Sequence, residues 1–101
     1  MTSLKAIPKS LREKVRKRDK ACRICGKPLA EHEGHIHHIY GRYATIPDYL
    51  GIPLTPHNNH EYNLILLCER CHERIHRLGM TQHQREKLIV ENMERRRENG
   101  I

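Results

Sequence analysis

Four cysteines are spaced as two pairs that could bind one metal ion together. Cys22 and Cys25 form one Cys-x-x-Cys pair, and Cys68 and Cys71 form the other. Zinc in structural sites prefers four ligands in a tetrahedron, and thiolate is among its best ligands. Each pair could supply two ligands from one turn, and the pairs together use every cysteine of the chain. The spacing therefore predicts a structural Zn²⁺ site.

Three other uses of these cysteines fit the sequence less well. Disulfides would suit a secreted protein, but residues 1–7 contain no export signal and no apolar run is long enough for a membrane span. A redox Cys-x-x-Cys would need only one pair. A finger with two cysteines and two histidines fails because no pair among His35, His37 and His38 has the required gap of about three to five residues. We therefore expect a cytoplasmic protein with reduced thiols and no membrane partner.

Histidines form a second group that could bind a metal ion. His72 and His76 are four positions apart, which places both on one face of a helix. His37 and His38 are adjacent and could supply a further ligand and a general base. The chain has 9 histidines, so solvent-exposed side chains in chance pairs are an alternative interpretation of this spacing.

The charge balance favours an anionic partner. The chain has 19 Lys and Arg against 12 Asp and Glu, a formal net charge of +7. Nucleic acid is the first candidate and an anionic membrane surface the second, although such a charge could also serve only solubility. A chain of 101 residues without Trp or Phe has little apolar side chain to bury. A metal would therefore be expected to help stabilise it.

One domain, residues 1–101, is expected to position these side chains. It comprises a basic helix at 4–20, a zinc knuckle and core at 21–78, and a C-terminal helix at 81–98. The first helix has its apolar stripe at Ile7, Leu11 and Val15.

Within the core, we predict two short strands followed by a helix. The strands are expected at residues 35–40 and 62–67, and the helix at 69–78, ended by Gly79. Between the strands, 41–61 is rich in Gly and Pro and is expected to form a long loop. In the C-terminal helix, Thr81 and Gln84 have the spacing of a capping box.

The order of these parts resembles the HNH endonuclease family, in its branch with a four-cysteine zinc. The matching segments are His37-His38-Ile39, Asn63 to Cys68, and Cys71 to His76, with Cys22 and Cys25 upstream. The resemblance covers about residues 20–78. It implies a small α+β fold with a ββα-metal core, in which two strands and a helix surround one catalytic divalent ion. The terminal helices lie outside it.

The resemblance implies metal-dependent hydrolysis of DNA phosphodiester bonds. His37, His72 and His76 would ligate the catalytic ion, which could be Mg²⁺, Mn²⁺, Ni²⁺ or Zn²⁺. His38 would be the general base, and Asn63 would hold the loop and the base in position. Small members of this type are similar to phage-encoded proteins. The resemblance thus further implies the cytoplasm of a bacterial or phage-infected cell, with DNA and the phage DNA-packaging machinery as partners.

Some assignments stay open at this point. Arg42 could contact the phosphate or be a solvent-exposed loop residue. Adjacent residues of a strand point to opposite faces, so His37 and His38 reach one site only if the chain bends or the strand ends there. His35 shares a strand face with His37 and could replace it as a ligand. The second hypothesis for the whole chain is a non-catalytic zinc-ribbon module that binds nucleic acid and does not cleave it.

Overall fold

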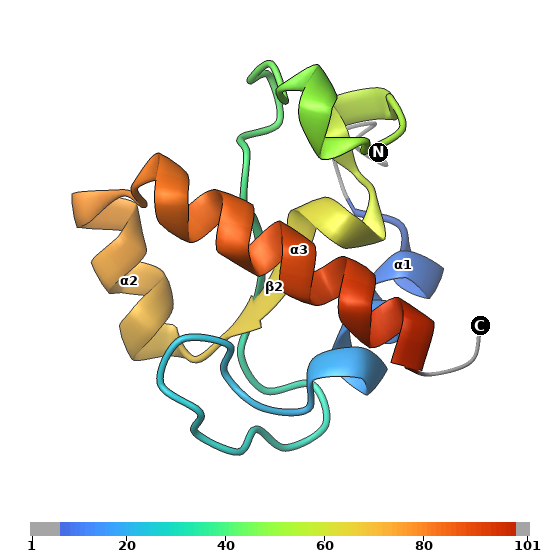
Figure 1. Cartoon of the computed structure of the whole chain (residues 1–101). Helices are drawn as coiled ribbons and strands as arrows, with labels where there is room; N and C mark the ends of the chain where they lie inside the picture. Colours follow the sequence, from blue (N-terminus) through green and yellow to red (C-terminus); the bar gives the residue numbers. More distant parts are fainter. Residues whose placement is uncertain (1–6, 99–101) are drawn as a thin grey trace, which may run out of the picture.

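The chain folds around a two-stranded antiparallel sheet, as expected for a small α+β protein. The structure, a computed structural model, describes residues 7–98. The elements in chain order are α1 (Lys9–Asp19), β1 (His35–His38), β2 (Leu64–Leu67), α2 (Glu69–Leu78) and α3 (Gln82–Glu98), shown in Figure 1. Three short 3-10 turns lie between the strands, at Asp48–Leu50, Pro56–Asn58 and Glu61–Asn63.

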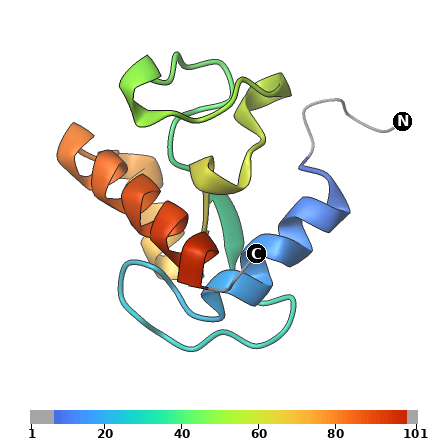
Figure 2. The ribbon, with the colours of Figure 1, turned by 45° about the vertical axis from the view of Figure 1, so that its right-hand side comes forward.

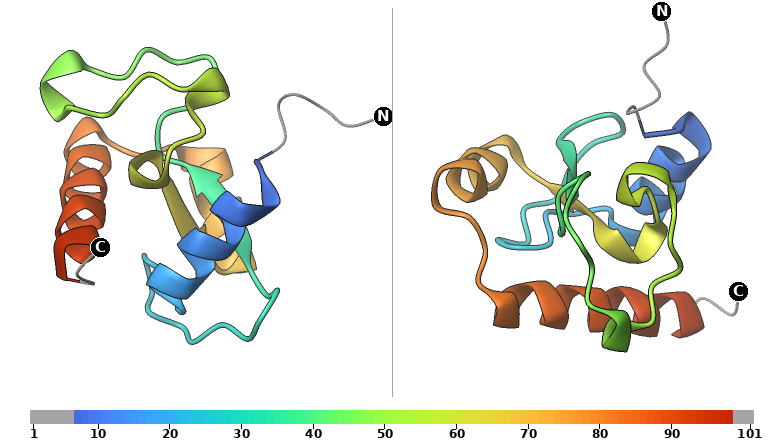
Figure 3. Two further views of the ribbon diagram at one scale, coloured as in Figure 1. Left: turned by 90° about the vertical axis from the view of Figure 1, so that its right-hand side faces the viewer. Right: turned by 90° about the horizontal axis from the view of Figure 1, so that it is seen from above.

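β2 lies at the centre of the core. Its four residues are all buried, because α1 packs on one face of the sheet and α2 on the other. Figure 3 shows these two helices on opposite sides of the strands, with α3 along a third side. A strand covered on both faces is apolar at every position instead of alternating, which explains the sequence Leu64–Leu67.

Two connecting segments lie at opposite ends of the sheet (Figure 2). Residues 21–34 carry the first cysteine pair and lead from α1 into β1. Residues 41–58 leave β1 at its other end and return to β2 through the 3-10 turns. The sheet thus separates the first cysteine pair from the long loop that follows the paired histidines.

The predicted helices are present with small changes in their ends. The bounds of the helix expected at 69–78 are confirmed, and Gly79 follows it with φ +72°. The capping box is also confirmed: the Gln84 N–H donates to Thr81 Oγ1 at 3.1 Å, and the Thr81 N–H donates to Gln84 Oε1 at 3.0 Å. The first helix begins at Lys9 and not at residue 4, since Pro8 is extended with ψ 143°. Residues 4–6 lie outside the described residues.

Both predicted strands are longer than the observed ones. β1 ends at His38 and β2 begins at Leu64, so the expected bounds of 35–40 and 62–67 were wrong. The reason is Asn63, which sits in a 3-10 turn and bonds Tyr40 through its side chain in place of a backbone ladder. The long loop predicted at 41–61 is present, and all three 3-10 turns begin within it.

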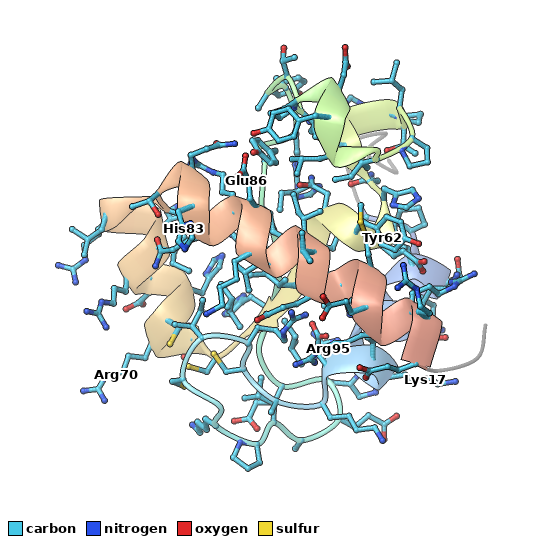
Figure 4. The ribbon with its side chains drawn as sticks, viewed as in Figure 1. Lys17, Tyr62, Arg70, His83, Glu86 and Arg95 are labelled. Carbon is cyan, nitrogen blue, oxygen red and sulfur yellow. The ribbon has the colours of Figure 1, made fainter. Side chains whose placement is uncertain are left out.

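A buried ion-pair cluster joins α1 to the rest of the fold. The Asp19 carboxylate, fully buried, accepts hydrogen bonds from Arg18 Nε at 2.7 Å and Arg23 Nη1 at 3.0 Å. It also accepts from the backbone N–H of Leu66 in β2 at 3.0 Å. Arg95 of α3, labelled in Figure 4, lies 3.4 Å from the same carboxylate. Nothing in the sequence pattern had indicated this cluster.

Of the helices described between residues 7 and 98, none combines the length and apolarity needed to cross a lipid bilayer.

Candidate functional site

The two cysteine pairs come together beside the start of α2. In the first pair, a tight turn forms because the Cys22 N–H donates to the Lys27 carbonyl and the Gly26 N–H donates to the Cys22 carbonyl, each at 2.9 Å. Gly26 has φ +81°, a conformation that a side chain disfavours. In the second pair, Cys68 caps α2, and its Sγ accepts from the Cys71 N–H at 3.5 Å.

The four sulfurs are close enough to share one ion. Their Sγ atoms all lie within 4.8 Å of one another, and Cys25 Sγ is 3.7 Å from Cys68 Sγ. A regular tetrahedron with Zn–S bonds of about 2.3 Å has edges of about 3.8 Å. All four residues are free thiols. The four cysteines could therefore hold a metal ion such as zinc.

The thiols differ in how easily they ionise. Burial raises the pKa of Cys22, but hydrogen bonds from the backbone at Cys25, Cys68 and Ile24 outweigh it and lower the pKa to about 6. Burial, together with hydrogen bonds to the neighbouring thiols, raises the pKa of Cys71 to about 12. A cluster of this kind needs a cation before all its thiols can become thiolates.

Four imidazole rings gather between β1 and α2. His37 lies opposite Ile65 in the sheet, on the face that α2 covers. Its ring meets the His72 ring edge-on, with centroids 5.7 Å apart, and the His72 and His76 centroids are 5.5 Å apart. The structure thus brings together His37, His72 and His76. As expected from the alternation of side chains along a strand, His35 lies on the same face of β1 as His37.

His35 and His37 meet His72 in different ways. The His35 ring stacks on His72 with centroids 4.4 Å apart and planes at 11°. The lone pairs of an imidazole lie in its ring plane, so two parallel rings do not point at one ion. The His37 ring is at 77° to His72, an arrangement compatible with convergence on a shared ligand. The geometry therefore favours His37 over His35 as the partner of His72.

The electrostatics at His37 and His72 favour the neutral form of both rings. Burial, followed by repulsion from the neighbouring histidines, lowers the pKa of His37 to about 4. Burial likewise lowers the pKa of His72, repulsion from His35 and His76 adds to the effect, and the carboxylates of Glu73 and Glu69 oppose it. A neutral imidazole has a lone pair available for a metal ion or for a proton.

His38 does not join this group, because β1 is still regular there and its side chain points to the other face. Its partner across the sheet is Leu64, and its Nε2 lies 2.7 Å from Asn59 Oδ1. Burial lowers the pKa of His38, the Asn59 hydrogen bond opposes this, and the charges of Arg42 and His57 lower it further. Arg42 itself is exposed. The strand ends at His38, so the chain turns away immediately after it.

The Asn63 side chain connects the two ends of the long loop by hydrogen bonds. Its side chain is fully buried. Oδ1 accepts from the Tyr40 N–H at 2.8 Å, and Nδ2 donates to the carbonyls of Tyr40 at 2.9 Å and Asn58 at 3.0 Å. The Asn63 carbonyl also accepts from the Ile39 N–H at 2.8 Å. Asn63 therefore fixes the backbone directly after His38, although it does not touch the His38 ring.

Three residues near the site were not identified from the sequence. Asn59 bonds the His38 ring, and Asn58 donates its side-chain amide to the carbonyls of Gly41 and Ala44 across the loop. Arg85 of α3 donates to the Ile39 carbonyl at 3.2 Å. The Asn58-Asn59 pair is a recognisable turn signal, but only the fold shows which ring it contacts.

The two groups are not equally ready to bind an ion. Among residues 7–98, the four cysteines are the one set of at least three histidine, cysteine or acidic side chains whose ligand atoms all lie within 4.8 Å. His37, His72 and His76 do not form such a set as they stand in the described part of the chain.

Comparison of the chain with protein-family models, with curated proteins and with solved structures finds no match.

Proposed function

We propose that this chain is a metal-dependent endonuclease of the HNH type that hydrolyses phosphodiester bonds in DNA. One observation carries the proposal: His37, His72 and His76 gather on one side of β1, while a fully buried Asn63 fixes the segment that follows His38. A module that only binds nucleic acid needs neither arrangement. The net charge of +7 supports a polyanionic substrate.

In this proposal the side chains have separate roles. His37, His72 and His76 hold one divalent cation, which when bound would polarise the phosphate and offset charge on the leaving oxygen. His38 is on the other face of β1 but is its last residue, so from the end of the strand it would accept the proton of the attacking water, and its lowered pKa keeps it neutral at neutral pH. Arg42, an exposed residue whose charge acts on His38, would contact the phosphate. The four cysteines hold a structural zinc ion.

We expect His38→Ala to lower the rate of plasmid nicking by about 100- to 10,000-fold, the usual contribution of a general base. The assay measures conversion of supercoiled plasmid at saturating protein, in the presence of Mg²⁺, Mn²⁺ or Ni²⁺. His83→Ala is the matched control, because His83 (Figure 4) is an exposed histidine on α3 with no assigned role. Equal rates for wild type and His38→Ala would show that His38 is not the base.

We expect His76→Ala to weaken binding of the second cation by more than about 10-fold. Loss of a direct imidazole ligand should reduce metal affinity at least as much as loss of a residue that only hydrogen-bonds a ligand. Titration of the zinc-loaded protein with Ni²⁺ in a calorimeter measures this affinity. His76 is exposed, so the far-ultraviolet circular dichroism should not change. His32→Ala, also an exposed histidine, should bind Ni²⁺ as the wild type does. Unfolding of His76→Ala would contradict the separation into two metal sites.

The non-catalytic zinc-ribbon module remains the second candidate. It is favoured by the spacing of the ligand atoms, since only the four cysteines already lie within 4.8 Å of one another in the described part of the chain. It predicts salt-dependent DNA binding with no cleavage under any metal. Elemental analysis after addition and removal of Mn²⁺ or Ni²⁺ separates the two: one tightly bound ion supports the module, and a second, weaker ion supports the nuclease.

A further inference from the structure

The His38 ring makes a hydrogen bond that constrains where its proton can lie. Its Nε2 is 2.7 Å from Oδ1 of Asn59. A neutral imidazole has one N–H donor and one acceptor nitrogen, whereas an amide oxygen only accepts. The two atoms therefore attract each other only when the proton is on Nε2. In that tautomer, Nδ1 carries the lone pair.

The backbone that carries Asn59 is held in place by the residue before it. Asn58 has φ +57°, in the left-handed region that asparagine tolerates better than most residues. Its side-chain amide donates to the carbonyls of Gly41 at 2.6 Å and Ala44 at 2.9 Å. Its own carbonyl accepts from Asn63 Nδ2 at 3.0 Å. These contacts connect the end of the long loop to its beginning.

Asn59 itself continues this turn. Its N–H donates to the Pro56 carbonyl at 3.1 Å, and His57, between them, also has a positive φ of 55°. Left-handed conformations at two successive non-glycine residues are uncommon and occur most often at functional sites, where surrounding contacts maintain them. Asn59 and His38 are both partly buried, so their hydrogen bond is stronger than one fully exposed to water.

We propose that Asn59 is a positioning residue that holds His38 in the Nε2–H tautomer and so assigns the role of proton acceptor to Nδ1. The catalytic consequence rests on the proposed nuclease function, but the tautomer itself does not. The two asparagines then have different tasks. Asn63 fixes the backbone that follows His38, and Asn59 fixes the ring.

The tautomer can be observed directly by NMR. Long-range ¹H–¹⁵N spectra of the zinc-loaded full chain distinguish protonated from unprotonated ring nitrogens, at a pH where the ring is neutral. The signals of His38 are identified by their absence from His38→Gln. We expect a protonated Nε2 and an unprotonated Nδ1 in the wild type. A proton on Nδ1 would mean that the Asn59 amide is oriented the other way, which would overturn the proposal.

Two substitutions test whether Asn59 is the cause. Asn59→Leu keeps the size of the side chain and removes the acceptor, so the two nitrogen shifts should move toward each other as the tautomers exchange. Asn59→Asp keeps an acceptor oxygen and should preserve the wild-type pattern. Leu54→Ala is the control, because Leu54 lies in the same loop and is 94% exposed. Wild-type shifts in Asn59→Leu would overturn the proposal.

Kinetics then test the consequence. We expect Asn59→Leu to lower kcat by about 10- to 100-fold, the usual effect of removing an outer hydrogen-bond partner, with KM unchanged. Zinc content and circular dichroism should match the wild type. An unchanged kcat in a variant with altered tautomer would overturn the positioning role. If the wild type cleaves no DNA, the nuclease proposal fails, while the NMR result still decides whether Asn59 sets the tautomer.

Discussion

Cys25→Ala is expected to unfold the chain at neutral pH. Cys25 is exposed, so its side chain adds little to core packing and an ordinary substitution there would change stability by less than about 0.5 kcal/mol. Its sulfur, however, lies 3.7 Å from that of Cys68 and within 4.8 Å of the other two cysteine sulfurs. If the four bind zinc, Cys25→Ala removes one of four ligands.

The expected size of the effect follows from the size of the core. Structural zinc in small domains binds with apparent free energies of about 10–16 kcal/mol at neutral pH. A domain of ordinary stability has about 5–15 kcal/mol in total. Three of the four cysteines also belong to the main apolar cluster, so the metal site and the core form together. Loss of most of the zinc affinity should therefore exceed the remaining stability.

The measurement is far-ultraviolet circular dichroism together with zinc content per chain. Ile24→Ala is the matched control, since Ile24 is the neighbour of Cys25 in the same turn and is 42% exposed. It should keep both the spectrum and the zinc. Chelation of the wild type should unfold it reversibly, with recovery on return of zinc. A folded, zinc-free Cys25→Ala protein with the wild-type melting temperature would show that the thiols serve no structural metal.

The features that the sequence predicted well depend on neighbours within one or two turns. The Cys-x-x-Cys pairs, the i, i+4 histidines of α2 and the Thr81–Gln84 capping box each lie within one short segment. Local geometry fixes such groups almost independently of the remaining chain. The apolar run Leu64–Leu67 lies within the strand predicted at 62–67, and it forms β2. That the two cysteine pairs would meet was an inference from zinc chemistry, and the structure brings them together.

The features that were missed depend on contacts between distant segments. The His38–Asn59 bond spans 21 positions, and the contact of Asp19 with Leu66 spans 47. Most other charged residues of the helix that contains Asp19 are exposed, and they occur on every side of it, so no periodicity separates Asp19 from them. The ends of both strands were misplaced for the same reason, because the side chain of Asn63 replaces a backbone ladder bond. The sequence pattern alone does not reveal where a side-chain hydrogen bond replaces a backbone hydrogen bond of the sheet.

Asp19→Ala is expected to destabilise the zinc-loaded protein by about 3–5 kcal/mol, the usual cost of removing one partner from a buried ion pair. The carboxylate is fully buried, and the side chains of Arg18 and Arg23 beside it are only 8% and 2% exposed. Without Asp19, these two guanidinium groups and the Leu66 N–H would lose an acceptor in a place that water does not reach readily.

The free energy of unfolding in urea, with zinc present, measures this loss. Glu13→Ala is the matched control, because Glu13 is an exposed acid on the same helix and should change stability by less than about 0.5 kcal/mol. Asp19→Asn keeps one acceptor oxygen but not the charge, so its effect should lie between the two. A change below about 1 kcal/mol for Asp19→Ala would contradict a role for the cluster in joining α1, the first cysteine pair and α3. The expected loss would instead establish that α1 is part of the cooperative unit that carries both candidate metal sites.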